Sequence, residues 1–385
     1  MTRRPLRVLL VGGPMYDPLY RLLEEFSSKE RVPVEVVAKL PHPELNARVA
    51  GDFSSGQADY DLISTHTKYA PSQARWLSPL EDSEIDLGSF QPHTLELARL
   101  DGALLSVPRN LDVKLLIYRS DLLSAPPATW RELRDKAAAL SRRPARFGFL
   151  FPGKESGLFG HFFELTAMAG GQLFPDPRVP APRAATEASR WALKTLVALQ
   201  AEAAPRSTPR WHYDQVAACF LHGQAAMTTD WPGSWYLYRS APRLAGRLGV
   251  SLYPEGPAGR WMYSSCHSFA VPKTARDRPA ALALLRYLTS LPAQLLEARL
   301  GSLPARLDAL ERVTAEAEGQ DAQRWGLLAE AAVHLLVPPK HPNYPAVEEV
   351  IWRQARSALQ GKISVDTALA AIDRLGGRAA RRQGV

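Results

Sequence analysis

Aromatic and acidic side chains able to bind a ligand follow a short apolar run in the second half of the chain. The segment FLHGQAAM places Gly223 at a helix end and residues 225–227 in a buried strand, which delivers Asp230 and Trp231 to an open edge. A pyranose ring has an apolar C–H face and a rim of hydroxyls, so it stacks on aromatic rings while polar side chains bind the rim. This pattern favours carbohydrate binding. The stacking candidates are Trp231, Trp235, Tyr236 and Tyr263.

A second polar segment, FPGKESG at residues 151–157, follows a predicted strand and precedes a predicted helix. Backbone amides and positive charge at a helix N-terminus favour oxygen-rich ligands, so Lys154 and Glu155 are binding candidates. The spacing of a Walker phosphate loop is missing.

Other chemistries lack their usual sequence patterns. His66, His161 and His267 have none of the short spacings typical of zinc sites, so we expect no metal. No G-x-S-x-G or H-E-x-x-H motif occurs, and we expect no catalytic residues and no cofactor. Cys219 and Cys266 are far apart and are expected to be free thiols.

The elements that position these residues alternate between strand and helix. Strands are predicted at 6–11, 32–40 and 59–64, with helices at 20–26 and 44–56. This order predicts an α/β fold with a parallel sheet, which binds ligands at the carboxyl ends of its strands. The loops after Val11 and Ser64 should therefore face one crevice. They carry Tyr16 and Asp17, and His66 and Lys68.

At 385 residues the chain is long enough for two lobes, each with its own core. The loop at 108–112 is polar between two apolar segments and suits a hinge. Thr129 and Glu132 have the spacing of a capping box that starts a helix in the second lobe. We predict one lobe from 1–112 plus about 268–318, another from 113–267 plus about 319–385, and a hinge near 108–115 and 264–270.

Composition excludes several classes of protein. The formal charge is +8, but its cations are scattered and the only dense basic run is terminal, so we expect no nucleic-acid partner. No apolar stretch approaches the ~20 residues that span a bilayer. The N-terminus is predicted to be a strand. We therefore expect a periplasmic or membrane-anchored extracellular protein if an export signal has been removed, and a cytoplasmic sensor otherwise.

Several segments together resemble family 1 extracellular solute-binding proteins of ABC importers, the group with maltose- and trehalose-type receptors. They are DGALLSVPRNLDVKLLIYRSDLL, PPATWRELRDKAAAL, HYDQVAACFLHGQAAMTTDWPGSW, SFAVPKTARDRPAALALLRYLTS and GSLPAR. The resemblance implies a two-lobed periplasmic-binding-protein fold, in which each lobe is a mainly parallel sheet flanked by helices and the ligand lies in the interlobe cleft. It also implies a monomer that captures a small carbohydrate, such as a di- or oligosaccharide, by hinge closure and delivers it to the transmembrane subunits of an ABC permease, without catalysis.

The resemblance also implies individual ligand contacts. Asp112 matches an acid four residues beyond a proline, and further contacts are implied for the loop with His66 and Lys68 and for the segment before the last sheet strand. His267 stands where relatives commonly have tryptophan, and Lys68 where an acid is common. The remaining implied residues are Ser265, Arg306, Lys340 and Tyr344.

Two alternatives follow from these departures. The same fold could bind a phosphorylated sugar, a glycerophosphodiester or another anion through the cations Lys68, Arg109, Lys154 and Lys340. A carbohydrate-active enzyme is the alternative of another class, and it would require two opposed carboxylates at the proper separation.

Overall fold

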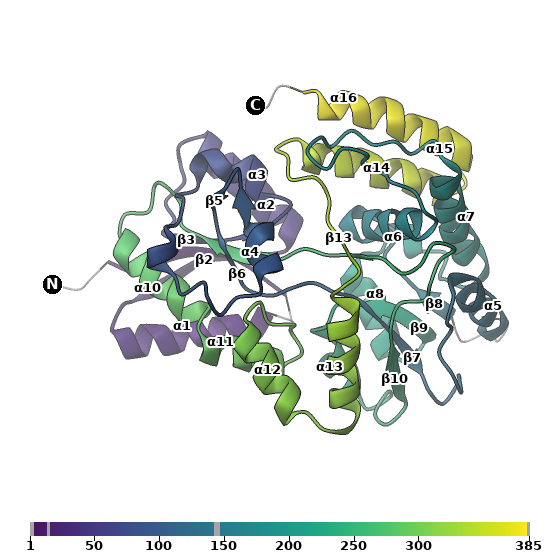
Figure 1. Cartoon of the computed structure of the whole chain (residues 1–385), viewed down its shortest axis with the longest axis horizontal. Coiled ribbons are helices and arrows are strands. Elements are labelled where there is room, and N and C mark those ends of the chain that lie inside the picture. Colours follow the sequence, from purple (N-terminus) through teal and green to yellow (C-terminus); the bar gives the residue numbers. More distant parts are fainter. Residues whose placement is uncertain (1–3, 14–15, 142–146, 383–385) are drawn as a thin grey trace. The chain divides into compact units, whose positions relative to one another are not determined.

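The computed structural model describes residues 4–13, 16–141 and 147–382. The chain folds into two compact units, each built from two separate segments (Figure 1). Unit 1 comprises Met1–Asp112 and Ser265–Ala317, and unit 2 comprises Val113–Ser264 and Glu318–Val385. The sequence-based boundary assigned residues 265–267 to the second lobe, whereas the structure assigns them to unit 1, where they lead into a sheet strand.

Unit 1 is a mixed sheet covered by helices. Its elements are β1 (Leu6–Val11), α1 (Asp17–Glu30), β2 (Val34–Leu40), α2 (His42–Ser54), β3 (Leu62–His66), α3 (Ala70–Gln73), α4 (Pro92–Ala98), β4 (Arg99–Leu100), β5 (Ala103–Leu104), β6 (Val107–Pro108), β12 (His267–Ala270), α10 (Arg278–Leu288), α11 (Leu291–Arg299) and α12 (Leu307–Glu316).

The strand order in the sheet of unit 1 is β2-β1-β3-β12-β6. β1 pairs in parallel with β2 and with β3, as the alternation of strands and helices predicted. β12 is antiparallel to both β3 and β6, which corrects the expectation of a parallel sheet. The chain enters β12 from unit 2 rather than through a helix packed on this sheet, so no strand-helix-strand crossover fixes its direction.

The core of unit 1 lies on both faces of this sheet. In β1, Leu6, Val8 and Leu10 belong to one apolar cluster, which also contains the buried residues of α1. Leu9 and Val11 belong to a second cluster with the buried residues of α2. Because alternate strand residues point to opposite faces, a strand with apolar residues on both faces is covered on both sides.

Unit 2 is built round a second sheet and a buried helix. Its elements are β7 (Leu115–Arg119), α5 (Trp130–Leu140), β8 (Phe147–Leu150), α6 (Glu155–Met168), α7 (Glu187–Glu202), α8 (Tyr213–Leu221), β9 (Ala225–Asp230), α9 (Ser234–Arg239), β10 (Leu248–Ser251), β11 (Met262–Tyr263), α13 (Gly319–Ala331), β13 (Leu335–Leu336), α14 (Tyr344–Leu359), α15 (Val365–Ala371) and α16 (Gly377–Ala380).

The sheet of unit 2 has the order β10-β7-β9-β8, and of its pairs only β8 with β9 is parallel. This mixed arrangement again corrects the expected mainly parallel sheet. α6 packs against α7 and α14 and is buried on nearly all sides, because it is apolar round most of its circumference. No helix in the described parts of the chain combines the length and apolarity needed to cross a membrane.

Candidate ligand-binding residues in the two units

Polar side chains of unit 1 meet at the edge of the sheet where the parallel strands end. Tyr16 and His42 follow β1 and β2, and His66 ends β3. His267 begins β12 and is the antiparallel partner of His66 in the register. The carboxyl ends of parallel strands share one edge, and an antiparallel neighbour contributes its first residue there. The fold thus gathers residues that are up to 251 positions apart.

We refer to His42, His66, Asp112 and His267 as the histidine cluster. His42 Nε2 lies 2.7 Å from His267 Nδ1. Asp112 Oδ2 is 3.8 Å from His66 Nε2 and 3.7 Å from His267 Nε2. The three histidine ring centroids are 4.4 to 5.1 Å apart. The cluster therefore brings imidazole nitrogens and a carboxylate to one point.

The Asp112 carboxylate is held from two sides. Ser265 Oγ donates to Oδ2 at 3.0 Å, and Asn110 Nδ2 donates to Oδ1 at 2.8 Å. Asp112 and Ser265 are also joined through their backbones, since the Asp112 N–H donates to the Ser265 carbonyl. The two hydrogen bonds on its oxygens fix the direction of the carboxylate, and the third holds the backbone of Asp112.

Burial sets the protonation of this cluster. It lowers the pKa of His66 and of His267 well below the usual value, and the Lys68 charge acts in the same direction on His66. Burial also raises the pKa of Asp112, although hydrogen bonds and neighbouring positive charge oppose that shift. Both rings are consequently neutral near pH 7 and can each donate and accept a hydrogen bond.

Two of the predicted cations of unit 1 are compensated within the protein. Arg109 is buried and binds Glu297, with Nε 2.8 Å from Oε1. Arg306 binds Asp308 at 2.8 Å. Each of these charges therefore has a carboxylate partner within unit 1.

The other predicted residues of unit 1 differ in their distance from the cluster. The Tyr16 hydroxyl lies 3.4 Å from His267 Nε2, so Tyr16 belongs with the cluster. Lys68 is buried, with Nζ 4.8 Å from the Tyr69 ring centroid. Asp17 is exposed in the first turn of α1, where its charge complements the helix dipole.

Unit 2 presents an aromatic group at the end of β9. Trp231 follows the strand, and its ring centroid is 5.6 Å from Tyr213 and 6.3 Å from Tyr263. Trp231 and Tyr213 are half-buried, whereas Tyr263 is buried. A half-buried indole beside a second ring offers a face on which an apolar ligand surface can stack.

A buried polar network lies beneath these rings. Lys114 Nζ binds Glu164 at 2.8 Å and lies 5.2 Å from the Trp231 ring centroid. Glu164 also accepts hydrogen bonds from Tyr253 Oη and Tyr263 N–H. Burial lowers the pKa of Lys114 and raises that of Glu164, while the attraction between their charges opposes both shifts. The network therefore holds the Lys114 ammonium group beside the Trp231 indole.

Asp230 ends β9 and is fully enclosed. Its carboxylate accepts hydrogen bonds from Tyr238 Oη and from the Trp231 N–H at 2.8 Å. Burial raises the pKa of Asp230 to about 6. The carboxylate therefore orients the backbone of Trp231.

Lys154 and Glu155 form their own ion pair at the start of α6, with Nζ 3.0 Å from Oε1. His212 Nε2 lies 3.8 Å from the other carboxylate oxygen of Glu155. Glu155 has a φ of 54°, in the left-handed region, which costs of order 1 kcal/mol for a residue other than glycine. Lys154 is a third predicted cation whose charge is compensated.

Two of the predicted ligand contacts, Trp235 and Tyr344, are buried in unit 2. Trp235 is 1% exposed, and its indole N–H donates to Asp321 at 3.0 Å. Tyr344 is fully buried and packs against Phe159 and Phe174. Both rings fill the core of unit 2 because they lie on the inner faces of α9 and α14. Lys340 is partly buried between β13 and α14.

Two members of these sites were absent from the sequence-based set. His42 was missed because it lies in the first turn of a helix that the apolar pattern placed slightly later. Tyr213 begins α8 and was not among the predicted stacking residues. The position of His42 directly after a strand was the signal that could have identified it.

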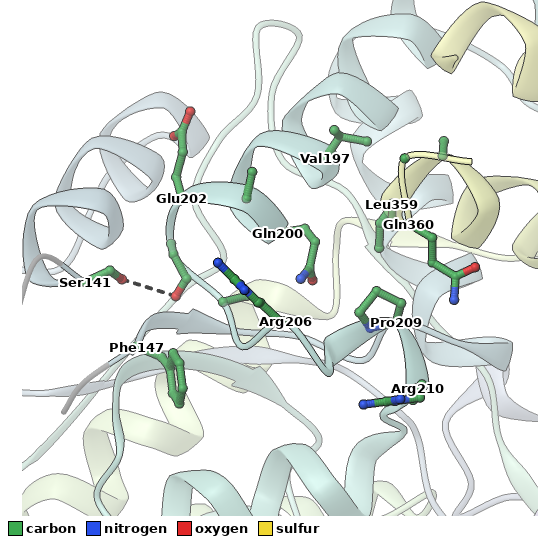
Figure 2. Close-up of a pocket in the computed structure, with 15 residues that line it drawn as sticks. Ser141, Phe147, Val197, Gln200, Glu202, Arg206, Pro209, Arg210, Leu359 and Gln360 are labelled. Atoms are coloured by element: carbon green, nitrogen blue, oxygen red, sulfur yellow. Dashed lines mark hydrogen bonds between the residues drawn. The ribbon is translucent and has the colours of Figure 1, made fainter. Parts of the chain in front are cut away.

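A surface hollow of about 820 Å³ lies elsewhere in unit 2 (Figure 2). It is lined by the end of α7, the end of α14 and the segment that carries Arg206 and Arg210. Ser141 Oγ donates to the Ala203 carbonyl at 3.2 Å on one side of it. None of the predicted site residues lines this hollow, so it gives no support to them.

Known proteins resemble this chain over most of its length. A curated relative from Sinorhizobium fredii, named a probable amino-acid ABC transporter periplasmic-binding protein, is 23% identical over 390 residues, 93% of this chain and 88% of the relative. The mannitol-binding protein of Pseudomonas aeruginosa is 23% identical and covers 88% of this chain and 85% of its own. The solved structure of maltose-bound MalE3 from T. maritima has a TM-score of 0.88 at 24% identity, covering 96% of this chain and 98% of MalE3.

A family model described as bacterial extracellular solute-binding protein matches residues 21–324. The chain belongs to this family, and the family resemblance found in the sequence is confirmed. The similarity to MalE3 also confirms the α/β, two-lobed periplasmic-binding-protein fold. The two curated relatives are named as binding proteins, and neither is named as an enzyme.

Proposed function

We propose that this protein is the substrate-binding component of an ABC importer and that its ligand is an uncharged carbohydrate, such as a di- or oligosaccharide. The ligand is captured by closure of the two lobes and released unchanged to the permease. The protein acts as a monomer outside the cytoplasmic membrane. The aromatic group of unit 2 carries this proposal, because Trp231 and Tyr213 offer half-buried ring faces.

The physical argument rests on the pairing of rings with fixed polar groups. Trp231 offers a surface for the C–H face of a sugar, and its backbone is held by Asp230. The compensated charges of Arg109 and Lys154 favour a neutral ligand over an anion. The names of the mannitol-binding and maltose-bound relatives support a polyhydroxylated ligand, whereas the Sinorhizobium relative is named for amino acids.

Isothermal titration calorimetry against mannitol, maltose and larger oligosaccharides tests the proposal. We expect at least one carbohydrate to bind and Trp231→Ala to weaken its affinity about tenfold, which corresponds to the roughly 1.4 kcal/mol of a lost stacking contact. Trp352→Ala is the matched control, because Trp352 is a partly buried tryptophan of α14 that stacks beside Arg353. Amino acids belong in the same screen. Binding of an amino acid alone, or equal affinity of Trp231→Ala and wild type, would contradict the carbohydrate proposal.

A further inference from the structure

The histidine cluster of unit 1 has a geometry that the carbohydrate proposal does not require. His66, Asp112 and His267 each offer one donor atom, and these atoms all lie within 4.8 Å of one another. Asp112 Oδ2 is 3.8 Å from His66 Nε2 and 3.7 Å from His267 Nε2. A tetrahedral ion with bonds of about 2.1 Å needs ligand atoms about 3.4 Å apart. The two distances from Asp112 Oδ2 are within about 0.4 Å of this value, and the donor atoms of the two histidines, which lie no more than 4.8 Å apart, would approach by up to about 1.4 Å to bind one ion.

We propose that His66, Asp112 and His267 bind a divalent transition-metal ion of the zinc class. The spacing of His66 and His267 along the chain predicted no metal, because the two histidines are distant in sequence and are brought together by the antiparallel pairing of β3 with β12. This proposal is independent of the carbohydrate proposal, since it concerns the ion alone.

The donor set selects the class of ion. Two imidazole nitrogens and one carboxylate oxygen suit Zn²⁺, Co²⁺ or Ni²⁺, whereas Mg²⁺ and Ca²⁺ prefer oxygen ligands alone. Three protein ligands also leave at least one coordination position for another oxygen or nitrogen ligand. The carboxylate neutralises one of the two positive charges of the ion.

The surroundings of the donors resemble those of protein-bound metals. His267 Nδ1 lies 2.7 Å from His42 Nε2, so a proton on Nδ1 can be donated to His42 while Nε2 keeps its lone pair for the ion. Partners of this kind orient metal-binding histidines and fix their tautomer. Asp112 is oriented in the same way by Ser265 and Asn110.

Three neighbouring groups oppose the ion to different degrees. The backbone N–H of Lys68 donates to His66 Nδ1, with the two nitrogens 3.2 Å apart. Coordination of an ion through Nε2 places the ring proton on Nδ1, so this hydrogen bond is lost. The Tyr16 hydroxyl, 3.4 Å from His267 Nε2, must turn away. Lys68 carries a charge of the same sign as the ion, whereas the charge of Arg109 is compensated by Glu297.

Titration of metal-free protein without a histidine tag tests the site. Co²⁺ is the probe, because its visible absorption bands report imidazole and carboxylate coordination, and Zn²⁺ should displace it. We expect one Co²⁺ per chain in the wild type. His66→Ala and His267→Ala should each weaken binding at least 100-fold, and His42→Ala about 10- to 100-fold, the usual effect of losing an orienting partner.

Two controls keep the test decisive. His222→Ala removes an exposed histidine of unit 2 and should bind Co²⁺ as the wild type does. Asp112→Asn preserves the shape of the side chain, so it decides the question if the alanine variants fail to fold. It should melt like the metal-free wild type yet bind Co²⁺ at least tenfold more weakly. Absence of the coordination bands in the wild type, or unchanged binding in Asp112→Asn, would overturn the proposal.

Discussion

Asp230 is a buried carboxyl whose pKa is raised to about 6 by the loss of water around it. Lys114 and Tyr238 are the titratable groups that act on it most closely. Between about pH 4 and pH 6 the folded protein binds a proton there that the unfolded chain, with a pKa near 3.9, has released. The free energy of unfolding therefore falls as pH rises through this window, by about 3 kcal/mol in total from this group.

We expect Asp230→Asn to remove this pH dependence, because an amide does not ionise. The measurement is denaturant unfolding of both proteins from about pH 4 to pH 7. The stability of the wild type should fall relative to that of the variant up to about pH 6 and then run parallel to it. A constant difference between the two proteins across the range would show that the carboxyl ionises normally.

The residues of the candidate sites were predictable to different extents. Trp231 was identified because an aromatic residue after a buried strand and before Pro232-Gly233 must lie where the chain turns. The burial of Trp235 was not identified, because α9 is only a short helix and shows too few turns to display its inner face. The compensation of Arg109 by Glu297 depends on a contact across 188 residues, which no local pattern reports.

At the scale of elements, the apolar patterns predicted the order of the first three strands and first two helices of unit 1. Strand directions were less predictable, because β12 and β10 pair according to where the chain arrives rather than according to a helical crossover. Helix starts were predictable where a side chain supplies the missing hydrogen bond. Thr129 Oγ1 accepts from Glu132 N–H at 3.2 Å, and Glu132 accepts in turn from Ala128 N–H rather than from Thr129 itself.

Removal of this cap should destabilise α5 measurably. Thr129→Ala leaves the Glu132 N–H without its acceptor and should lower the free energy of unfolding by about 1 kcal/mol. Thr129→Ser keeps the hydroxyl and should stay within a few tenths of a kcal/mol of the wild type. Denaturant unfolding followed by circular dichroism measures both. Equal losses in the two variants would assign the effect to the threonine methyl group rather than to the cap.

At the scale of the whole molecule, the chain passes between the units three times, after residues 112, 264 and 317. Unit 1 consequently receives β12 and three of its helices from a segment that follows most of unit 2 in the sequence. The sheet of unit 1 is incomplete until that segment has been made. The boundary near residue 265 was hard to predict for the same reason, since it is defined by the Asp112 and Thr67 contacts of the returning chain.

The net charge of +8 makes the dependence of ligand affinity on salt a test of ligand charge. A neutral carbohydrate has no charge for the protein field to attract, so its dissociation constant should change less than about twofold between about 0.01 M and 1 M NaCl, where the screening length falls from ~30 to ~3 Å. An anionic ligand should bind about tenfold or more weakly at the higher salt concentration. Lys68→Gln separates the effect of the Lys68 charge from that of the net charge of the protein, because Lys68 is the predicted cation beside the histidine cluster. If its substitution and added salt weaken binding to the same extent, the ligand carries a negative charge and lies against unit 1. If neither the substitution nor added salt weakens binding, the ligand is neutral. That result agrees with the compensation of Arg109 by Glu297 and of Lys154 by Glu155.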